Sequence, residues 1–542
     1  MRKEFFTASL MVIAILVGGY FFLPEIYHPA HTTVSVVAGV IILIGLRDAL
    51  QTRHTILRNF PVLGHFRYYL EMVRPEIQQY FIESNTDGRP FSREERSLVY
   101  QRAKGELDTL PFGTQRDVYE PGYQWIKHSL LAKHVEPESL RIKIGNKDCK
   151  QPYSASIMNI SAMSYGSLSS RAIQALNGGA KDGAFAHNTG EGSISAHHLK
   201  NGGDLIWQIG TGYFGCRNPD GTFNPEMFKA NAHRPEVKMI EVKLSQGAKP
   251  GHGGILPGKK ITKEISEIRG VPMGQDVISP PTHSTFNTPR GLIEFVKELR
   301  DLSGGKPVGF KLCIGKRREF MSICKAMHEM DIYPDFIAVD GGEGGTGAAP
   351  LEFSNFIGSP GVESLIFVHN CLVGFGIRKH IRILSSGKIA SAFDMMKRLS
   401  IGADVCYAAR SMMLSIGCIQ ALRCNSNDCP AGVATNDPNL ESGLVVSHKR
   451  VRAASFHRET VKSFAHMLGA MGLEHSDDLR PWHLMTRTGP SQVKHFGQMF
   501  EFVSDGDFLN GKMPEDYMWS YKLSSSETFD SLTKPAHSGL NS

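Results

Sequence analysis

The amino-acid sequence predicts an α/β protein built on a closed (β/α)8 TIM barrel, preceded by a transmembrane helical hairpin. Two observations predict the barrel. From about residue 155 onward, short apolar runs alternate with helical stretches and end in turn residues, which indicates a parallel sheet with crossover helices. About eight such units fall within roughly 270 residues, which fits a closed barrel better than an open sheet. A third observation, two charge-free runs near the N-terminus, predicts the hairpin.

Apolar composition and the helical stretches between the runs place the individual strands. The expected strands are Ser156–Met163, Ala184–His187, Val237–Leu244, Pro307–Cys313, Phe336–Val339, Arg382–Leu384 and Asp404–Tyr407. The expected helices among them are 169–182, 290–302, 317–330 and 389–400. Ligands of such barrels bind at the carboxyl ends of the strands, so the residues that follow each strand are the candidate site residues.

The first fifty residues predict a membrane hairpin. Phe5–Leu23 carries no charge over 19 residues and is long enough to cross a bilayer as a helix. A second apolar run, Thr32–Leu46, is shorter at 15 residues and ends at Arg47, whose side chain can snorkel. Basic residues flank both outer sides and are absent between the runs, so both ends are expected in the cytoplasm. A cleaved signal peptide is the alternative, although no A-x-A site follows.

Four segments are expected along the 542 residues: a hairpin (1–50), a connector or collar (51–150), the barrel with a cysteine loop (151–445) and a C-terminal extension (446–542). The net charge of +7 is mild, and aromatic residues are not interleaved with basic runs, so no nucleic-acid partner is expected. The nine cysteines are odd in number and mostly lie singly in apolar runs, which predicts a reducing compartment rather than a disulfide framework.

Six motifs follow the expected strands and predict a phosphate-bearing cofactor. They are SYGS (164–167), NTGEG (188–192), Lys311 in GFKLC, DGGEGGTGAAP (340–350), SSGK (385–388) and AARSMM (408–413). Backbone amides of glycine-rich loops after the last two strands are how such a barrel holds a phosphate. Each motif alone is weak, because a glycine cluster is more often a simple turn. Six of them on one rim are hard to explain by structural needs alone.

Cys418, Cys424 and Cys429 form a second kind of motif, spaced by six and then five positions, with Pro430 directly after the last. A cysteine run that ends in Cys-Pro is typical of iron–sulfur proteins. The residues 425–428 between them are polar, where buried core cysteines are not expected. The spacing therefore favours an iron–sulfur cluster, with a zinc site or three unrelated structural cysteines as alternatives. Three thiolates leave one cluster corner without a ligand or imply a three-iron cluster.

Several of these motifs together resemble the flavin-binding synthase domain of glutamate synthase. They are MSYGSLS (163–169), NTGEG (188–192), QGAKPGHGGILPGKK (246–260), ISPPTHS (278–284), GGTGAAP (344–350) and the cysteine run that continues as CPAGVATNDP. The resemblance covers residues from about 155 to 445, and the whole chain is similar to stand-alone FMN-binding glutamate synthase proteins of bacteria.

The resemblance implies FMN in the barrel and a [3Fe-4S] cluster on the three cysteines. It implies that 2-oxoglutarate and ammonia condense to an imine, which is reduced to L-glutamate with electrons that reach the flavin through the cluster. Lys311 would lie beside the flavin ring, and Glu191, Gln246 and Lys249 would face the substrate. His283 is a candidate for proton transfer, with a purely structural role as the alternative. The candidate FMN-binding residues are Met163, Ser164, Ser167, Asn188, Lys311, Gly344, Gly345, Thr346, Gly347, Ser386, Gly387, Ala409 and Arg410.

The chain also departs from that family pattern. Its loop SSGKIAS stands where the family more often has paired glycines followed by Arg, and ISPPTHS keeps one His of two. Neither a glutaminase domain nor a dinucleotide-binding motif is expected, so the implied partners are an external electron donor (ferredoxin or a reductase subunit) and possibly a separate glutaminase. An N-methylglutamate synthase-like subunit and a membrane-bound redox relay are alternative functions. The expected location is the inner (cytoplasmic) membrane, with the catalytic domain facing the cytoplasm.

Overall fold

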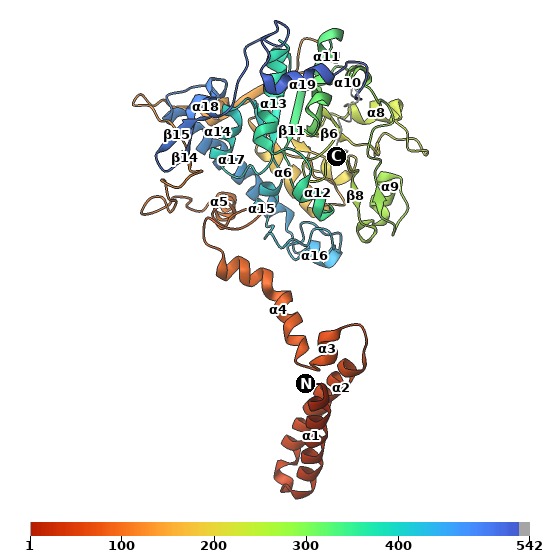
Figure 1. Ribbon diagram of the computed structural model, residues 1–542. Coiled ribbons are helices and arrows are strands. Elements are labelled where there is room, and N and C mark those ends of the chain that lie inside the picture. Colours follow the sequence, from red (N-terminus) through yellow and green to blue (C-terminus); the bar gives the residue numbers. More distant parts are fainter. Residues whose placement is uncertain (1, 531–542) are drawn as a thin grey trace, which may run out of the picture. The chain divides into compact units, whose positions relative to one another are not determined.

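The computed structural model describes residues 2–530, and the chain divides into two compact units between Arg93 and Glu94 (Figure 1). The first unit contains α1 (Arg2–Phe22), α2 (His28–Leu50), α3 (Thr55–Asn59), α4 (Gly64–Ile77) and a π turn, η2 (Gln78–Ile82). In the described residues, α1 and Glu25–Leu50 are the two stretches long and apolar enough to cross a membrane. A core helix of a soluble protein can be equally long and apolar, but such a helix is mostly buried. Here only 6% of the apolar window in α1 and 17% of that in Glu25–Leu50 is buried.

The second unit holds a closed barrel of eight parallel strands among the described residues. In order around the ring they are β4 (Met158–Ile160), β5 (His187–Asn188), β6 (Leu205–Ile209), β7 (Val237–Lys243), β10 (Val308–Cys313), β11 (Phe336–Asp340), β12 (Arg382–Ser386) and β13 (Val405–Ala408). Pairing of β13 with β4 closes the ring. The predicted barrel is confirmed. Strand β6 lies outside the expected strands, and β5 begins at His187, where the expected second strand ends.

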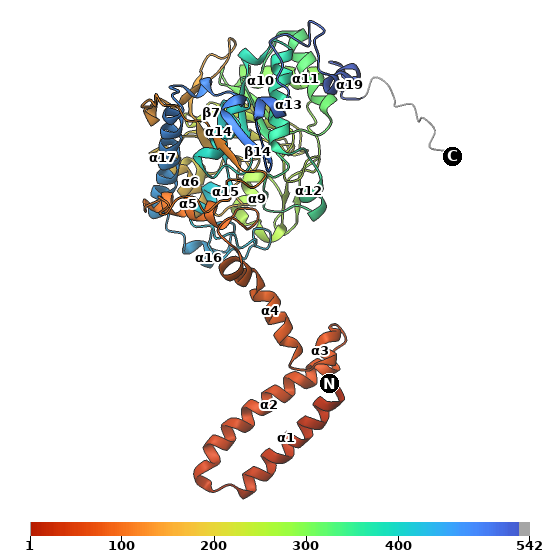
Figure 2. The same ribbon diagram turned by 60° about the vertical axis from the view of Figure 1, so that its left-hand side comes forward.

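Helices cover the outside of the barrel (Figure 2). The longer ones are α6 (Ser170–Asp182), α8 (Pro225–Ala232), α10 (Pro289–Leu302), α11 (Arg317–Met330), α13 (Gly361–Gly374), α14 (Ala392–Ser400) and α17 (Val446–Ala470). Side-chain caps fix several starts: the hydroxyl of Ser169 accepts the N–H of Ala172, and that of Thr288 accepts the N–H of Gly291. A cap satisfies a backbone donor that the first turn leaves without a partner, so each helix begins at a defined residue after its strand.

An antiparallel hairpin, β2 (Arg141–Ile144) and β3 (Tyr153–Ser156), closes one end of the barrel. Ile142 and Ile144 are buried in one cluster with Phe336, which begins β11, and with Val405, which begins β13. The amino-terminal end of the barrel is therefore filled by apolar side chains. The opposite, carboxyl-terminal end is left for a site.

Segments before and after the barrel meet in one small sheet. Strand β1 (Gln124–Ile126) pairs with β14 (Leu484–Gly489), which pairs with β15 (Gln492–His495). The helices α18 (Phe496–Met499) and α19 (Glu515–Leu523) follow this sheet. Helix α5 (Arg93–Lys104) contacts α17, because the hydroxyl of Ser455 donates a hydrogen bond to the carbonyl of Arg102. The connector and the C-terminal extension thus share contacts around the barrel. The segment boundaries at 50, 150 and 445 stay a prediction.

We predict that Asp335 is the costliest single charge to remove from the amino-terminal end of the barrel. Its carboxylate accepts hydrogen bonds from Arg300 Nη2 (3.0 Å), the Val308 N–H (2.9 Å) and the Asn146 N–H (2.8 Å). Both charged side chains are buried. Removing one partner of such a pair costs about 3–5 kcal/mol. Asp335→Ala should lower the midpoint of thermal unfolding accordingly.

The control is Glu474→Ala, which removes the exposed ion pair to Lys133. Exposed pairs contribute about 0–1 kcal/mol, so this variant should unfold close to wild type. Equal losses in both variants would contradict a special role for the buried pair.

Candidate active site

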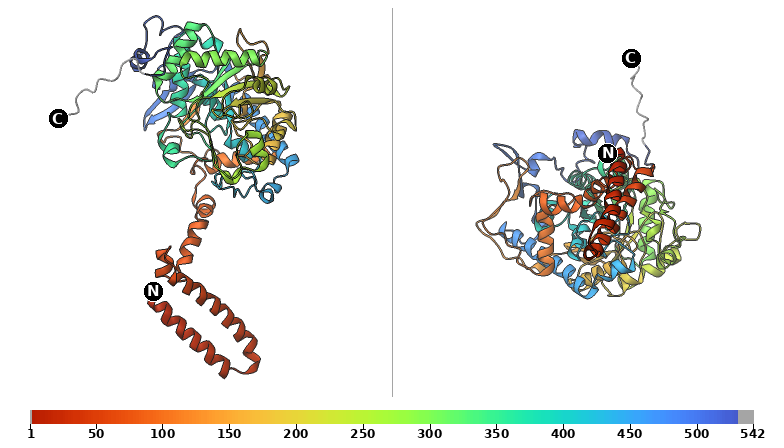
Figure 3. Two further views of the ribbon diagram at one scale, coloured as in Figure 1. Left: turned by 90° about the vertical axis from the view of Figure 1, so that its right-hand side faces the viewer. Right: turned by 90° about the horizontal axis from the view of Figure 1, so that it is seen from below.

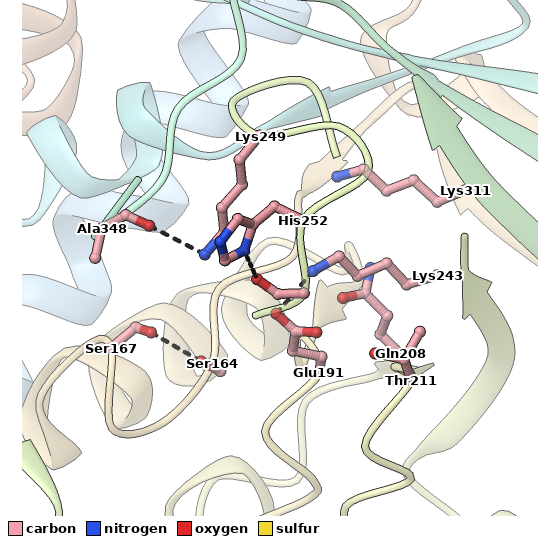
Figure 4. A network of polar contacts seen from close by, with 12 residues as sticks. Ser164, Ser167, Glu191, Gln208, Thr211, Lys243, Lys249, His252, Lys311 and Ala348 are labelled. Atoms are coloured by element: carbon pink, nitrogen blue, oxygen red, sulfur yellow. Dashed lines mark hydrogen bonds and ion pairs between the residues drawn. The ribbon is translucent and has the colours of Figure 1, made fainter. Parts of the chain in front are cut away.

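The predicted site residues follow the carboxyl ends of the barrel strands. Met163, Ser164 and Ser167 follow β4; Asn188 and Glu191 lie at and after β5; Gln246, Lys249 and His283 follow β7; Lys311 is on β10; Gly344, Gly345, Thr346 and Gly347 follow β11; Ser386 and Gly387 lie at the end of β12; and Ala409 and Arg410 follow β13. Figure 4 shows Lys243, Lys249 and Lys311 reaching from different elements toward one region. The topology therefore brings these residues to one rim.

Two lysines stand side by side at this rim. Lys243 of β7 and Lys311 of β10 are partners in the register of the two parallel strands. Each has its own carboxylate: Lys243 Nζ lies 2.7 Å from Glu191 Oε1, and Lys311 Nζ lies 3.3 Å from Asp340 Oδ2. Burial opposes the charge on Lys311, but Asp340 and Glu241 outweigh it and raise the pKa of Lys311. Both lysines are thus buried, and each is paired with a carboxylate.

Glu191 is a carboxylate among cations. Burial alone would raise its pKa, but Lys243, Lys249 and Arg269 lower it. Gly254 of the QGAKPGHGG motif lies against it, and a Cβ there would come within 2.4 Å of Glu191 Oε1. The motif therefore needs glycine at this position so that the chain can approach the carboxylate.

Arg269, the last residue of α9 (Lys263–Arg269), reaches the same region. One of its terminal nitrogens donates to the carbonyl of Tyr165 (2.8 Å), and its guanidinium lies 5.3 Å from the centre of the Phe214 ring. Its buried Nε has no hydrogen-bond partner within the described chain. Burial lowers the pKa of Arg269 to about 10, so the group remains a cation with donor capacity left over.

Among the lysines that Figure 4 shows at this rim, Lys249 has the least negative charge in direct contact with its ammonium group. Its Nζ donates to the carbonyl of Ala348 (3.0 Å, Figure 4), and within the described residues it has no ion pair. Burial lowers its pKa to about 8, which Glu191 only partly offsets. Nearby, the buried side-chain nitrogen of Gln246 has no hydrogen-bond partner in the described chain. Buried donors without acceptors are costly, so these groups fit an anionic, oxygen-rich ligand.

Glu241 lies inside the barrel, two residues below Lys243 on β7. Its carboxylate accepts hydrogen bonds from Asn188 (2.9 Å), Gln208 (2.6 Å) and Tyr407 (3.1 Å). These partners come from β5, β6 and β13, so one carboxylate ties together strands on several sides of the barrel. Its charge also supports the protonated form of Lys311.

His283 has both ring nitrogens engaged. Nε2 lies 2.9 Å from the carbonyl of Lys243, and Nδ1 lies 3.0 Å from the hydroxyl of Tyr213. Burial lowers the pKa of His283 to about 4, so the ring is neutral at ordinary pH. This geometry positions the strand end that carries Lys243, and the proton-transfer role of His283 stays a prediction.

The glycine-rich turns after β11 and β12 form a corner suited to a phosphate. A Cβ on Gly345 would come within 2.7 Å of the Arg410 side chain, and Gly387 has a φ of +116°, which favours glycine. Arg410 donates to the carbonyl of Glu343 (2.7 Å). A cation and close backbone fit the phosphate of FMN.

The three predicted cluster cysteines are free thiols on the loop after β13. Burial raises the pKa of Cys418 to about 12, and the nearness of Cys424 and Cys429 adds to the rise. Cysteine sulfur is the usual ligand of iron–sulfur clusters, so the donor type suits a cluster, whereas the raised pKa opposes the thiolate form in the absence of a metal. Within residues 2–530, however, no group of three or more His, Cys, Asp or Glu side chains is arranged to hold a metal ion.

That loop is docked onto the rim. The amide of Asn436 donates to the carbonyls of Gly166 (2.9 Å) and Lys260 (2.8 Å), and the Ser169 hydroxyl donates to the carbonyl of Gly432 (2.7 Å). Lys260 in turn donates to the carbonyl of Ser167 (2.7 Å). The cysteine loop and the first strand end are therefore parts of one structure.

Sequence reasoning missed three charged residues of this site. Glu241 and Lys243 stand at alternate positions of the run VKMIEVKL, whose third charged residue is Lys238, and period-two charges in a buried strand are a signal for a polar barrel interior. Arg269 offered no comparable signal, because it ends a surface-type helix far along the chain from its contacts.

Comparison with known proteins identifies the family. The family profile described as the conserved region in glutamate synthase matches residues 123–474. The glutamate synthase large subunit-like protein YerD of Bacillus subtilis (strain 168) is 35% identical over 502 residues, which cover 85% of this chain and 95% of YerD.

More distant relatives carry related names. An archaeal glutamate synthase (NADPH) of Methanocaldococcus jannaschii is 31% identical over 361 residues, which cover 66% of each chain. The ferredoxin-dependent glutamate synthase 2 of Synechocystis is 31% identical over 284 residues, or 51% of this chain and 17% of that one. A solved mandelate oxidase mutant aligns over 80% of this chain and 99% of its own, with 14% identity and a TM-score of 0.40. The chain belongs to the glutamate synthase family and is an oxidoreductase of the class that acts on CH–NH2 donors.

Proposed function

We propose that this protein performs the FMN-dependent reductive amination of 2-oxoglutarate to L-glutamate. The observation that carries the proposal is the incompletely compensated positive charge at the rim, above all Lys249 with only a carbonyl partner. A dicarboxylate is the kind of substrate that completes such a site, because each carboxylate supplies acceptors for buried donors.

The substrate residues divide into two groups. Lys249, Arg269 and the side-chain amide of Gln246 supply donors for the two carboxylates of 2-oxoglutarate. Glu191 supplies a carboxylate, held ionised by its neighbours, that can accept a hydrogen bond from ammonia or from the developing amine. The pairing of Glu191 with Lys243 keeps that acceptor in place.

For the cofactor, we assign the phosphate to the corner of Gly345, Gly387 and Arg410, and the ring to the side of Lys311. The remaining predicted residues, Met163, Ser164, Ser167, Asn188, Gly344, Thr346, Gly347, Ser386 and Ala409, line the same rim. When bound, FMN supplies the hydride-transfer chemistry. Lys311, protonated beside Asp340, holds positive charge where the reduced flavin gathers negative charge.

We assign the [3Fe-4S] cluster to Cys418, Cys424 and Cys429, with an external donor, a ferredoxin or a reductase subunit, as the source of electrons. We also propose that α1 and α2 anchor the enzyme in the cytoplasmic membrane. Their length, composition and exposure support this placement.

The direct test is an anaerobic assay of detergent-purified protein with reduced ferredoxin, 2-oxoglutarate and ammonium. Formation of L-glutamate is the expected result. If turnover is faster with methylamine than with ammonium and the product is N-methylglutamate, the nitrogen donor is methylamine and not ammonia. If protein that holds both cofactors forms no amino acid from any amine, the synthase function is excluded and a redox relay is the remaining function.

The first prediction concerns Lys249 and pH. Because the pKa of Lys249 is lowered to about 8, the group is a cation below pH 8 and loses its charge above it. The Kd of 2-oxoglutarate, measured without ammonia from the change in flavin absorbance, should be flat near pH 7 and rise about tenfold per pH unit well above pH 8.

Two variants at the same position sharpen this test. At pH 7, Lys249→Met should weaken binding by about 30-fold or more, because truncating one partner of a buried charge pair costs about 2–5 kcal/mol, and this difference should shrink above pH 8, where wild type loses the charge as well. Lys249→Arg keeps its charge at high pH and should remove the rise in Kd. A rise of the same size in Lys249→Arg would assign the titration to another group.

The second prediction concerns the FMN reduction potential and two residues of opposite charge, Lys311 and Asp340, beside the proposed flavin ring. Lys311→Met removes a buried cation and should lower the FMN reduction potential, whereas Asp340→Asn removes the carboxylate that compensates Lys311 and should raise it. For a two-electron couple about 30 mV corresponds to about 1.4 kcal/mol, so shifts of tens of millivolts are expected.

The control for this pair is Lys316→Met, an exposed cation shortly after β10. It should leave the potential unchanged. Equal potentials in Lys311→Met and wild type, with FMN fully bound in both, would show that Lys311 does not act on the flavin.

The third prediction concerns the cysteines. Purified protein should contain about three irons per chain, and serine in place of Cys418, Cys424 or Cys429 should remove them, as trithiolate ligation requires. Cys324 and Cys371, which are buried elsewhere in α11 and α13, serve as controls, and their serine variants should keep the iron. Stoichiometric zinc without acid-labile sulfide would contradict the assignment.

A further inference from the structure

Helix α4 and the π turn that continues it carry an exposed apolar stripe. The residues Leu63, Phe66, Leu70, Val73, Ile77 and Phe81 follow one another at intervals of three or four, which places them on one face of a helix. We name these six residues the α4 stripe. Phe66 is 64% exposed and Phe81 is 83% exposed, so the first unit by itself does not cover the stripe.

The borders of the α4 stripe have the composition of a membrane interface. At 3.6 residues per turn, Arg67 and Arg74 fall along one border, and Tyr69 and Tyr80 fall along the other. Arginine can lay its apolar stem on a hydrocarbon surface while its charge meets a phosphate, and tyrosine favours the same depth. The carboxylates of the helix, Glu71 and Glu76, fall outside the stripe.

The start of α4 is fixed at the end of α2. Asp48 in the last turn of α2 is buried, and its carboxylate accepts the N–H of Val62 (3.0 Å) and lies 2.8 Å from His65 Nε2. Figures 2 and 3 show α4 leaving in a different direction from α2 instead of continuing it. A helix that begins where a membrane helix ends, and turns away from it, begins at the bilayer surface.

We propose that the α4 stripe lies in the surface of the bilayer that α1 and α2 cross, with Arg67 and Arg74 on anionic headgroups. The proposal rests on the membrane assignment of α1 and α2. Both ionisable residues along the borders are cations, and the inner leaflet is anionic, so charge favours lipid over a protein partner. Arg67 pairs with Glu71 (Nη2–Oε1, 2.9 Å), but an exposed pair of this kind contributes only about 0–1 kcal/mol and leaves the guanidinium able to reach a headgroup. Continuity with the two apolar helices points to the same partner.

The test is photo-crosslinking of the full-length protein in nanodiscs that contain phosphatidylglycerol. A benzophenone amino acid is placed at Leu70, on the stripe, or at Met72, which is similarly exposed but on the opposite side of the helix. Mass spectrometry should find phospholipid adducts at position 70 at least fivefold more often than at position 72. In nanodiscs of neutral lipid the yield at position 70 should fall, and R67Q/R74Q should remove this dependence on lipid charge.

Other occupants of the stripe would give other products. A crosslink from position 70 to a peptide of residues 94–542, a covalent dimer, or equal lipid adducts at positions 70 and 72 would overturn the proposal. Extraction with alkaline carbonate separates this failure from that of the membrane hairpin. Protein that stays with the membrane but gives no adduct at position 70 refutes the stripe alone, whereas release by carbonate refutes the hairpin and the stripe together.

Discussion

The site depends on keeping two neighbouring lysines charged. Lys243 and Lys311 occupy paired positions on adjacent strands, which lie about 4.8 Å apart in such sheets. Buried cations on neighbouring strands repel each other unless each has a compensating anion. Glu191 and Asp340 offset this repulsion, one carboxylate for each lysine. Because Glu191 follows β5 and Asp340 ends β11, the charge balance holds only when the barrel is closed in its native register.

Glu241 extends this constraint into the barrel interior. A buried carboxylate is tolerated because Asn188, Gln208 and Tyr407 all donate to it. The same carboxylate supports the charge on Lys311 from below. Asn188 therefore serves the charge network through its side chain, while its place at the end of β5 also puts it on the proposed cofactor rim. The packing of the barrel core and the electrostatics of the rim are not separable at these residues.

The barrel and its rim could be predicted from sequence because both are local patterns. Strand–helix alternation and turn residues after each strand suffice to place Lys311 or Gly345 at the carboxyl end. Strand β6 was not predicted, because Leu205–Ile209 is a short apolar run without a clear helix after it. Its strand conformation depends on pairing with β5 and β7. Arg269 was not predicted as a site residue for a related reason. Its partners, Tyr165 and Phe214, lie far away in sequence, and only tertiary packing brings them together.

The cysteine loop shows how charge also joins the proposed cluster to the rim. Thiolates bound to a cluster would need nearby positive charge. Burial lowers the pKa of Lys260 to about 8, and Cys424 and Cys429 partly offset this fall. Lys260 also donates to the carbonyl of Ser167, beside the first strand end. One lysine therefore contacts the rim and lies close to two of the three cysteines. Because it belongs to the same QGAKPGHGGILPGKK segment as Gln246 and Lys249, one stretch of chain sets the charge at both the substrate side and the cysteine side of the site.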